Sequence, residues 1–211
     1  MNLTVVKLGG STAADTRLSE WIEALTQATQ PLIIVPGGGP FADQVREMQT
    51  RLGFSDAAAH VMAILAMEQF GVLICDLNPR FRPARQPQDV RQAIEEGKIP
   101  VWLPSAMTIG RSDIPVSWEV TSDSLAAWLA GTIRADTILL IKQTDDFSQE
   151  DDKTTIQARG IVDEAFDAMM PLDVALFVAG PRHLAEAASL LEQGRLPGIA
   201  LTTTRARSAC A

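Results

Sequence analysis

Cysteine and basic charge are both scarce in this sequence of 211 residues. Cys75 and Cys210 form neither a disulfide framework nor a zinc motif, so both are expected to be reduced thiols. The chain has no Lys/Arg-rich run, and 18 basic against 26 acidic side chains give a formal charge of -8. Because nonspecific affinity for nucleic acid needs a basic face, we expect no nucleic-acid partner.

Long apolar runs are also absent, since no stretch reaches the roughly 18 uninterrupted apolar residues of a membrane helix. The opening residues MNLTVVKLGG lack the basic start and long apolar segment of a signal peptide. We therefore expect a cytoplasmic protein with no membrane partner. Hydrophobic residues at 46% and charged residues at 21% are ordinary for a globular chain, and the length fits one domain over residues 1–211.

Apolar segments of strand length alternate with segments of helical period. Strands are predicted at residues 3–8, 32–35, 72–75, 101–103, 137–141, 174–178 and 199–202. Helices are predicted around residues 18–25, 41–52, 56–69, 90–96, 125–130 and 181–192. Continuous apolar strands are buried on both faces, which is typical of a mostly parallel sheet between two layers of helices. The predicted fold is a three-layer α/β/α sandwich.

Two glycine clusters follow two consecutive predicted strands: residues 7–11 are Lys-Leu-Gly-Gly-Ser and residues 36–40 are Pro-Gly-Gly-Gly-Pro. Glycine at a strand's carboxyl end lets the backbone approach a ligand, and the N–H groups there form an anion site. Either cluster alone fits a tight turn equally well. Two at corresponding positions, one with Lys7 at the strand end, favour phosphate binding. Neither is a Walker loop or a dinucleotide fingerprint.

A polar cluster, residues 117–124 with the sequence SWEVTSDS, leads into an apolar helix. Thr121 or Ser122 can cap that helix, and Asp123 falls in its first turn, where negative charge is favourable. Capping explains the residue types, whereas the position at a strand-to-helix junction points to a ligand. Lys142 ends another strand, and an exposed strand-end lysine is the alternative to a functional one.

Together these segments resemble the amino acid kinase family. The family opens with a strand ending in Lys-x-Gly-Gly-Ser, its second strand ends in Gly-Gly-Gly, and its catalytic aspartate precedes a helix. These features are matched by Lys7, Gly9, Gly10, Ser11, Gly37, Gly38, Gly39 and Asp123. Residues 115–126, PVSWEVTSDSLA, are similar to the small kinases of methanofuran biosynthesis, which convert an aminomethylfuran-methyl phosphate to its diphosphate.

The resemblance implies a kinase that uses ATP and Mg²⁺ on a phosphorylated small molecule. Catalytic roles are expected for Lys7, Asp123 and Lys142, with no protein ligand set for the metal. Nucleotide contacts are expected from Gly9, Gly10, Ser11, Thr144 and Asp145. Acceptor contacts are expected from Gly37, Gly38, Gly39, Trp118 and Ser122. Trp118 can stack on a flat substrate ring or pack in the core.

The sequence departs from the family after residue 141. Residues 142–147, KQTDDF, keep Thr144 and Asp145 but lack the family's glycine, and no Gly-Gly-Met…Lys stretch supplies a second lysine. Lys142 or Lys153 is the candidate replacement. The polar residues 143–159 are predicted to be a mobile loop, flexible without nucleotide and ordered with it.

Three alternatives stay open: a nucleotide-binding storage or regulatory protein, an isopentenyl phosphate kinase, and a carboxylate kinase. Carboxylate kinases hold the acceptor with an arginine near the second glycine turn, where Arg46 is the nearest candidate. Family members commonly pair through the helix after the second strand, so a homo-oligomer, a dimer or higher, is expected.

Overall fold

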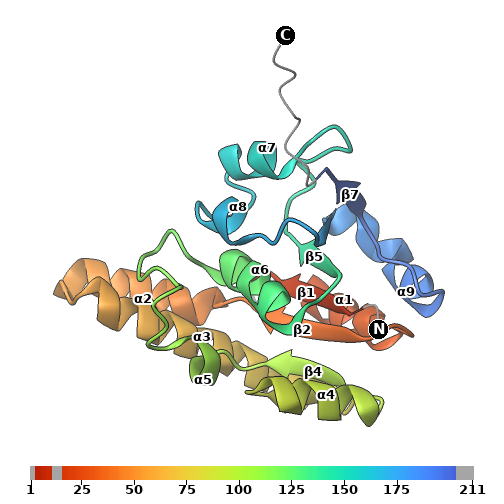
Figure 1. Cartoon of the computed structure of the whole chain (residues 1–211), viewed down its shortest axis with the longest axis horizontal. Helices are drawn as coiled ribbons and strands as arrows, with labels where there is room; N and C mark the ends of the chain where they lie inside the picture. The colour runs from red at the N-terminus through yellow and green to blue at the C-terminus, as the bar shows by residue number, and fades with distance from the viewer. Residues whose placement is uncertain (1–2, 11–15, 203–211) are drawn as a thin grey trace.

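A computed structural model describes residues 3–10 and 16–202 and contains one seven-stranded sheet, with strand order β3-β4-β2-β1-β5-β6-β7 (Figure 1). The strands are β1 (Thr4–Leu8), β2 (Leu32–Pro36), β3 (Phe81–Ala84), β4 (Ile99–Trp102), β5 (Thr137–Ile141), β6 (Ala175–Ala179) and β7 (Ile199–Leu201). All paired strands are parallel except β7, which runs antiparallel to β6. The mostly parallel sheet predicted from the sequence is confirmed.

Helices cover both faces of the sheet. They are α1 (Arg17–Thr26), α2 (Gly39–Leu52), α3 (Asp56–Leu77), α4 (Pro87–Glu95), α5 (Ser105–Thr108), α6 (Ser122–Ile133), α7 (Lys153–Ala158), α8 (Phe166–Met169), the 3-10 turn η2 (Pro181–His183) and α9 (Leu184–Glu192). One core cluster joins the sheet to α1, α9 and the second half of α3, and the other joins it to α4, α6, α7 and α8. This is the predicted three-layer sandwich.

The central strands form because their apolar runs have two faces to bury. Every residue of β1, β2, β4 and β5 is buried, so these strands show no alternation of apolar and polar residues. Lys7, in β1, is the charged residue inside this apolar layer. A buried lysine needs a charged partner, which the functional site supplies.

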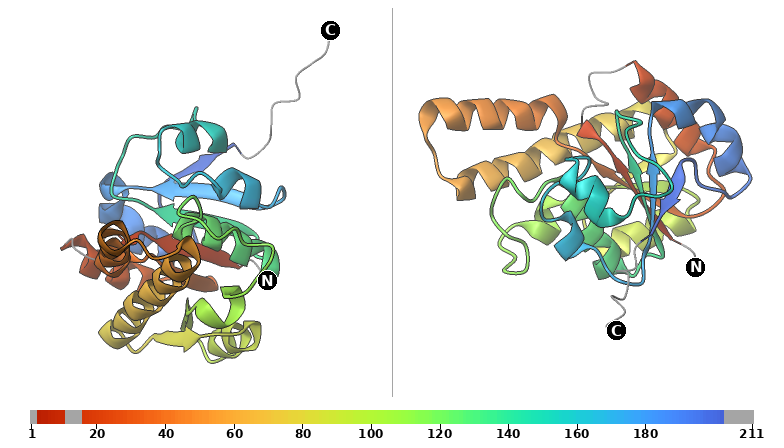
Figure 2. Two further views of the ribbon diagram at one scale, coloured as in Figure 1. Left: turned by 90° about the vertical axis from the view of Figure 1, so that its left-hand side faces the viewer. Right: turned by 90° about the horizontal axis from the view of Figure 1, so that it is seen from above.

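α2 and α3 form an antiparallel pair that projects beyond the sheet (Figure 2). The predicted strand at residues 72–75 is wrong, because α3 continues to Leu77. A short apolar run fits a buried helix as well as a strand. Gly71 permits close packing, since a Cβ there would lie 2.6 Å from Cδ2 of Leu103.

α3 is also long and apolar enough, by length and composition, to cross a membrane, which counting uninterrupted apolar residues did not show. In this fold it packs against α2 and the sheet, with Phe70 and Ile74 fully buried. Leu65, Val72 and Leu77 on the same helix are exposed. Some apolar side chains of α3 therefore pack in the core, whereas others are exposed on its surface.

Two further segments differ from the sequence predictions. β3 was missed because only its first and last residues are buried and Pro83 interrupts it, as suits an edge strand. The loop predicted at residues 143–159 contains α7, and Phe147 and Ile156 lie in the core. These two side chains, among many polar ones, are enough to attach the segment to the domain.

Candidate active site

Strand register places two lysines on one face of the sheet. Lys7 of β1 is opposite Leu140 of β5, and Lys142 follows two residues later. Because side chains alternate between faces with a period of two, Lys142 leaves the sheet on the same side as Lys7. Both side chains therefore extend toward α6, which covers this face.

Asp123, in the first turn of α6, lies between the two lysines. Its Oδ1 is 3.0 Å from Nζ of Lys7, and its Oδ2 accepts a hydrogen bond of 2.6 Å from Nζ of Lys142. The side chains of Lys7, Asp123 and Lys142 are 7%, 6% and 11% exposed. The structure thus brings the three predicted catalytic residues into one buried cluster, here called the triad, and Lys142 is not a free strand-end lysine.

The triad carries one more positive than negative charge. Burial opposes ionisation of Asp123, but Lys142 and Lys7 outweigh it and hold the pKa of that carboxyl at about 2. The pKa of Lys142 is lowered to about 8, because burial and the charge of Lys7 together outweigh the opposing effect of Asp123. A buried cation in excess is costly unless an anion joins it. The site is therefore suited to an anionic ligand.

The two glycine turns contact each other directly. A Cβ on Gly10 would lie 2.2 Å from the nitrogen of Gly39, and one on Gly37 would lie 2.2 Å from the nitrogen of Gly10. Gly39 also has a φ of 53°. Part of the glycine requirement is thus close backbone packing, the tight-turn alternative. Ser11 lies outside the described residues.

Backbone donors in these turns are partly used by the fold. The N–H of Gly9 donates to the carbonyl of Ile141 at 3.2 Å, and that of Gly37 donates to Leu8 at 2.9 Å. The N–H of Gly9 is therefore already bonded within the sheet, because the ladder extends one residue beyond β1, and a nucleotide contact of Gly9 stays a prediction. Gly38 and Gly39 begin α2, whose amino terminus attracts anions.

A cavity of about 240 Å³ opens beside the glycine turns. Backbone from both turns, the start of α6 and the facing sides of α2 and α3 enclose it. Its lining includes Gly10, Gly38, Gly39, Arg46, His60, Met67, Trp118, Thr121 and Ser122. Of the predicted acceptor residues, Gly38, Gly39, Trp118 and Ser122 line the cavity, whereas Gly37 is buried and does not line it. The volume is below the roughly 300–1,000 Å³ of drug-sized sites, so it suits a small molecule.

Trp118 belongs to the cavity wall and not to either core cluster. Its Nε1 donates a 2.6 Å hydrogen bond to Oε1 of Gln49. The guanidinium of Arg46 lies 4.4 Å from the ring centroid, which is a cation–π distance, and also bonds Asp43. Arg46 therefore covers one ring face and leaves a ligand the other face or the edge.

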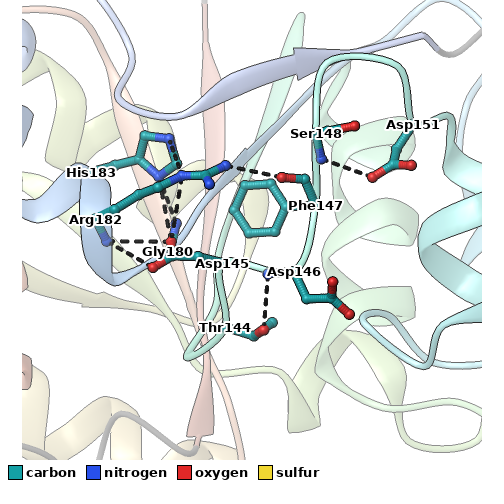
Figure 3. Close-up of polar contacts among 9 residues, drawn as sticks. All are labelled: Thr144, Asp145, Asp146, Phe147, Ser148, Asp151, Gly180, Arg182 and His183. Carbon is teal, nitrogen blue, oxygen red and sulfur yellow. Dashed lines mark hydrogen bonds and ion pairs between the residues drawn. The ribbon is translucent and has the colours of Figure 1, made fainter.

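Thr144 and Asp145 do not line this cavity; they follow β5, and Asp145 faces Gly180 and Arg182, which follow β6 (Figure 3). The carboxylate of Asp145 accepts from the backbone N–H of Arg182 at 3.2 Å, at the start of η2. Thr144 accepts from the N–H of Asp146 at 3.1 Å. Nearby, both amide atoms of the Gln143 side chain are buried with no hydrogen-bond partner in the described part of the chain. This edge retains unused polar capacity for a ligand.

Lys153 is not part of the triad. It is buried in α7, and its Nζ pairs with Oδ1 of Asp167 in α8. Of the two lysines proposed as the second catalytic lysine, Lys142 is the one placed at Asp123.

Asp163 is the residue of this site that the sequence analysis missed. Thr121 stands at the N-cap of α6 but makes no side-chain cap, contrary to expectation, and Ser122 is the first helical residue. The carboxylate of Asp163 takes the capping position and accepts from Thr121 and Ser124. An acidic residue some 40 positions downstream gives no sequence signal for such a contact.

Among the described residues, no cluster of three or more His, Cys, Asp or Glu side chains is placed to hold a metal ion. Mg²⁺ retains several waters and is commonly bound through substrate phosphates with only one or two carboxylates. The site therefore fits Mg²⁺ that arrives on a nucleotide and does not offer a protein cage.

Comparison with known proteins identifies the class. The sequence model described as Amino acid kinase family matches residues 2–170, most of the chain. The protein belongs to this family, which confirms the resemblance drawn from Lys7, the glycine turns and Asp123.

The chain is also similar to individual kinases. The chain is 27% identical over 143 residues to the [5-(aminomethyl)furan-3-yl]methyl phosphate kinase of Methanocaldococcus jannaschii, a match covering 67% of this chain and 66% of that protein. Uridylate kinase from Archaeoglobus fulgidus superposes with a TM-score of 0.68 at 18% identity, covering 96% of this chain and 100% of that one. Isopentenyl phosphate kinase superposes with a TM-score of 0.59 at 16% sequence identity, covering 95% of this chain and 100% of that one. At these identities the two structures establish the shared fold.

Proposed function

We propose that the protein is an ATP-dependent kinase that converts a phosphomonoester, [5-(aminomethyl)furan-3-yl]methyl phosphate, to its diphosphate in methanofuran biosynthesis. The observation that carries the proposal is the triad: a buried cluster with one excess positive charge, next to a small cavity at the sheet's carboxyl edge. Phosphoryl transfer brings two anions together, so catalysis depends on positioning them and neutralising their charge. The relative from M. jannaschii supports this acceptor.

In this proposal Lys7 and Lys142 contact the transferring phosphoryl group from one side. Lys7 lies in β1 and Lys142 directly follows the neighbouring β5, so the sheet and Asp123 hold both ammonium groups in place before substrate arrives. Asp123 orients the Lys142 ammonium by a charge-assisted hydrogen bond and the Lys7 ammonium by an ion pair. The acceptor oxygen belongs to a phosphate that is already ionised near neutral pH, so the reaction needs no general base.

We assign the nucleotide to the carboxyl ends of β1 and β5, with contacts expected from Gly9, Gly10, Ser11, Thr144 and Asp145. Gly10 contributes close backbone approach, and Asp145 fixes the start of η2 at the edge of this region. Mg²⁺ bound with ATP would supply charge neutralisation on the phosphates.

The acceptor is assigned to the cavity. Gly38 and Gly39 place the amino terminus of α2 against its phosphate, Ser122 offers a hydroxyl, and Trp118 offers an apolar surface to a furan ring. Arg46 is already bonded to Asp43 and stacked on Trp118, which favours a wall residue over the carboxylate anchor of a carboxylate kinase.

Assembly and location complete the proposal. The exposed residues Leu65, Val72 and Leu77 give α3 an apolar surface suited to another copy of the chain, so we propose a homo-oligomer, a dimer or higher. The protein would act in the cytoplasm, without membrane or nucleic-acid partners.

The test is ADP release on mixing the protein with Mg-ATP and [5-(aminomethyl)furan-3-yl]methyl phosphate, with product mass measured in parallel. We expect turnover and a product heavier by one phosphoryl group. The dephosphorylated alcohol, isopentenyl phosphate and free amino acids are the matched controls and should give little turnover. Tight ATP binding without turnover on any acceptor would favour the storage or regulatory alternative.

A further inference from the structure

The first turn of α6 is held from outside its own segment. Oδ2 of Asp163 accepts from the backbone N–H of Thr121 at 2.8 Å, from Oγ1 of Thr121 at 2.6 Å and from the N–H of Ser124 at 3.1 Å. Oδ1 of Asp163 accepts from Oγ of Ser124. One carboxylate thus takes four hydrogen bonds from two residues.

These two residues flank Asp123. Thr121 precedes it by two positions and Ser124 follows it directly, so Asp163 fixes the backbone on both sides of the aspartate that the lysines share. Asp123 itself points the other way, to Lys7 and Lys142. A helix end that is free to unwind would move the Asp123 carboxylate relative to two strands that cannot follow it.

Helix capping alone does not require this arrangement. Thr121 already stands at the N-cap with an extended backbone, and a threonine there is among the preferred capping residues. The chain instead uses a carboxylate 42 positions away from Thr121 and 39 from Ser124. A second tie, from the N–H of Ala165 to the carbonyl of Glu119 at 3.2 Å, joins the same two segments.

We propose that Asp163 is a positioning residue for phosphoryl transfer: its carboxylate holds the first turn of α6 so that Asp123 stays between Lys7 and Lys142. This inference rests on the proposed kinase function. The segment between α7 and α8 would thus affect catalysis, although it belongs to neither glycine turn and Asp163 does not line the cavity.

The experiment compares Asp163→Asn with Asp152→Asn. Asp152 caps α7 in the same part of the chain, accepting from the N–H and hydroxyl of Thr155 at 2.8 and 2.7 Å, but it does not touch α6. We expect Asp163→Asn to lower kcat about tenfold or more with both KM values changed less than about threefold, and Asp152→Asn to leave kcat unchanged. Equal kcat in the two variants would overturn the proposal.

The pH profile separates positioning from loss of fold. Asp163 is one of the charges facing Lys142, together with Asp123 and Lys7, and it raises the pKa of that lysine against the lowering by burial. Asp163→Asn should therefore move the alkaline limb of kcat/KM to lower pH, whereas Asp152→Asn should not move it. Asp163→Glu keeps the charge but shifts the carboxylate. The alkaline limb of kcat/KM should therefore stay at the wild-type pH, while kcat should still fall.

A readout without turnover keeps this test independent of the proposed function. Titration of the Lys142 ammonium by NMR should show a lower pKa in Asp163→Asn than in wild type and no change in Asp152→Asn. If wild type shows no activity on any acceptor, the kinase proposal fails, and this titration still tests the electrostatic link between Asp163 and Lys142. An unchanged Lys142 pKa in a folded Asp163→Asn protein would refute the link. Should that variant not fold, Asp163→Glu provides the kcat comparison.

Discussion

Lys142 and Lys153 are two buried lysines, each held by one aspartate, yet they have opposite electrostatic situations. Their side chains are 11% and 9% exposed. Lys153 has Asp167 to itself among the described residues, so that pair is neutral and joins α7 to α8. Lys142 shares Asp123 with Lys7, so its cluster keeps a net positive charge. The comparison teaches that a balanced pair serves the fold, whereas an unbalanced one leaves charge for a ligand.

The largest effect is expected from Asp123→Asn, which removes the charge that both lysines share. Leaving two buried cations without a carboxylate should lower stability by about 3–5 kcal/mol near neutral pH. Turnover should fall at least about 10³-fold, because neither ammonium group keeps its orientation. Urea unfolding and ADP release measure the two effects.

The stability loss of Asp123→Asn should also shrink as pH rises. The pKa of Lys142 is lowered to about 8 from its usual 10.5, and removing Asp123 lowers it further. Where the unfolded chain binds this proton and the folded chain does not, stability increases with pH. Unfolding curves at pH 7 and pH 9.5 test this, and a loss independent of pH would contradict the assigned burial of two cations.

Lys7→Ala should lower kcat about 10²–10³-fold, as expected for removal of one preorganised donor to developing charge. Unlike Asp123→Asn it removes the excess charge, so the protein should remain folded. Steady-state kinetics with a thermal unfolding control checks both expectations. A kcat within about threefold of wild type would show that Lys7 does not touch the phosphoryl group.

Activity of the wild type should depend on the protonation of Lys142. Because burial lowers its pKa to about 8, kcat/KM should fall above that pH, at most tenfold per unit. Bound phosphates favour the charged form, so the limb in kcat should lie at higher pH. A pH–rate profile of both parameters is the measurement, and a flat profile to pH 10 would argue against a required ammonium at this position.

Lys153→Met should have the smallest effect on catalysis. It breaks a balanced pair, so stability should fall by up to about 3 kcal/mol, moderated because Asp167 can be solvated. For the folded fraction, kcat should change less than about threefold. Steady-state kinetics below the melting temperature tests this. A loss of kcat as large as that of Lys7→Ala would show that Lys153 takes part in catalysis.

Sequence patterns predicted the helix and strand layers well because the central strands are continuous apolar runs. They also singled out Lys7, Asp123 and Lys142, each at a strand or helix end. Strand order was beyond their reach, since nothing local shows that β1 lies between β2 and β5. The convergence of the triad depends on that order and on register.

The other differences between the sequence predictions and the structure also have physical causes. The predicted strand at 72–75 failed because Gly71 serves contact with Leu103 and does not end the helix. The supposed loop after residue 143 has few apolar residues, but Phe147 and Ile156 are the ones that pack. The contact of Asp163 with the start of α6 could not be predicted, because its partners are about 40 residues away in the sequence.

The contact between the two glycine turns constrains how this enzyme fold can diversify. A side chain at Gly10 or Gly37 would collide with the opposite backbone at 2.2 Å, so neither glycine can be replaced unless the facing turn moves. The projecting pair of α2 and α3 carries Arg46 and His60 on the cavity wall and is free of that constraint. If the cavity holds the acceptor, as proposed, selection for a different substrate would act on the wall formed by α2 and α3, while the packing of the two glycine turns stays fixed.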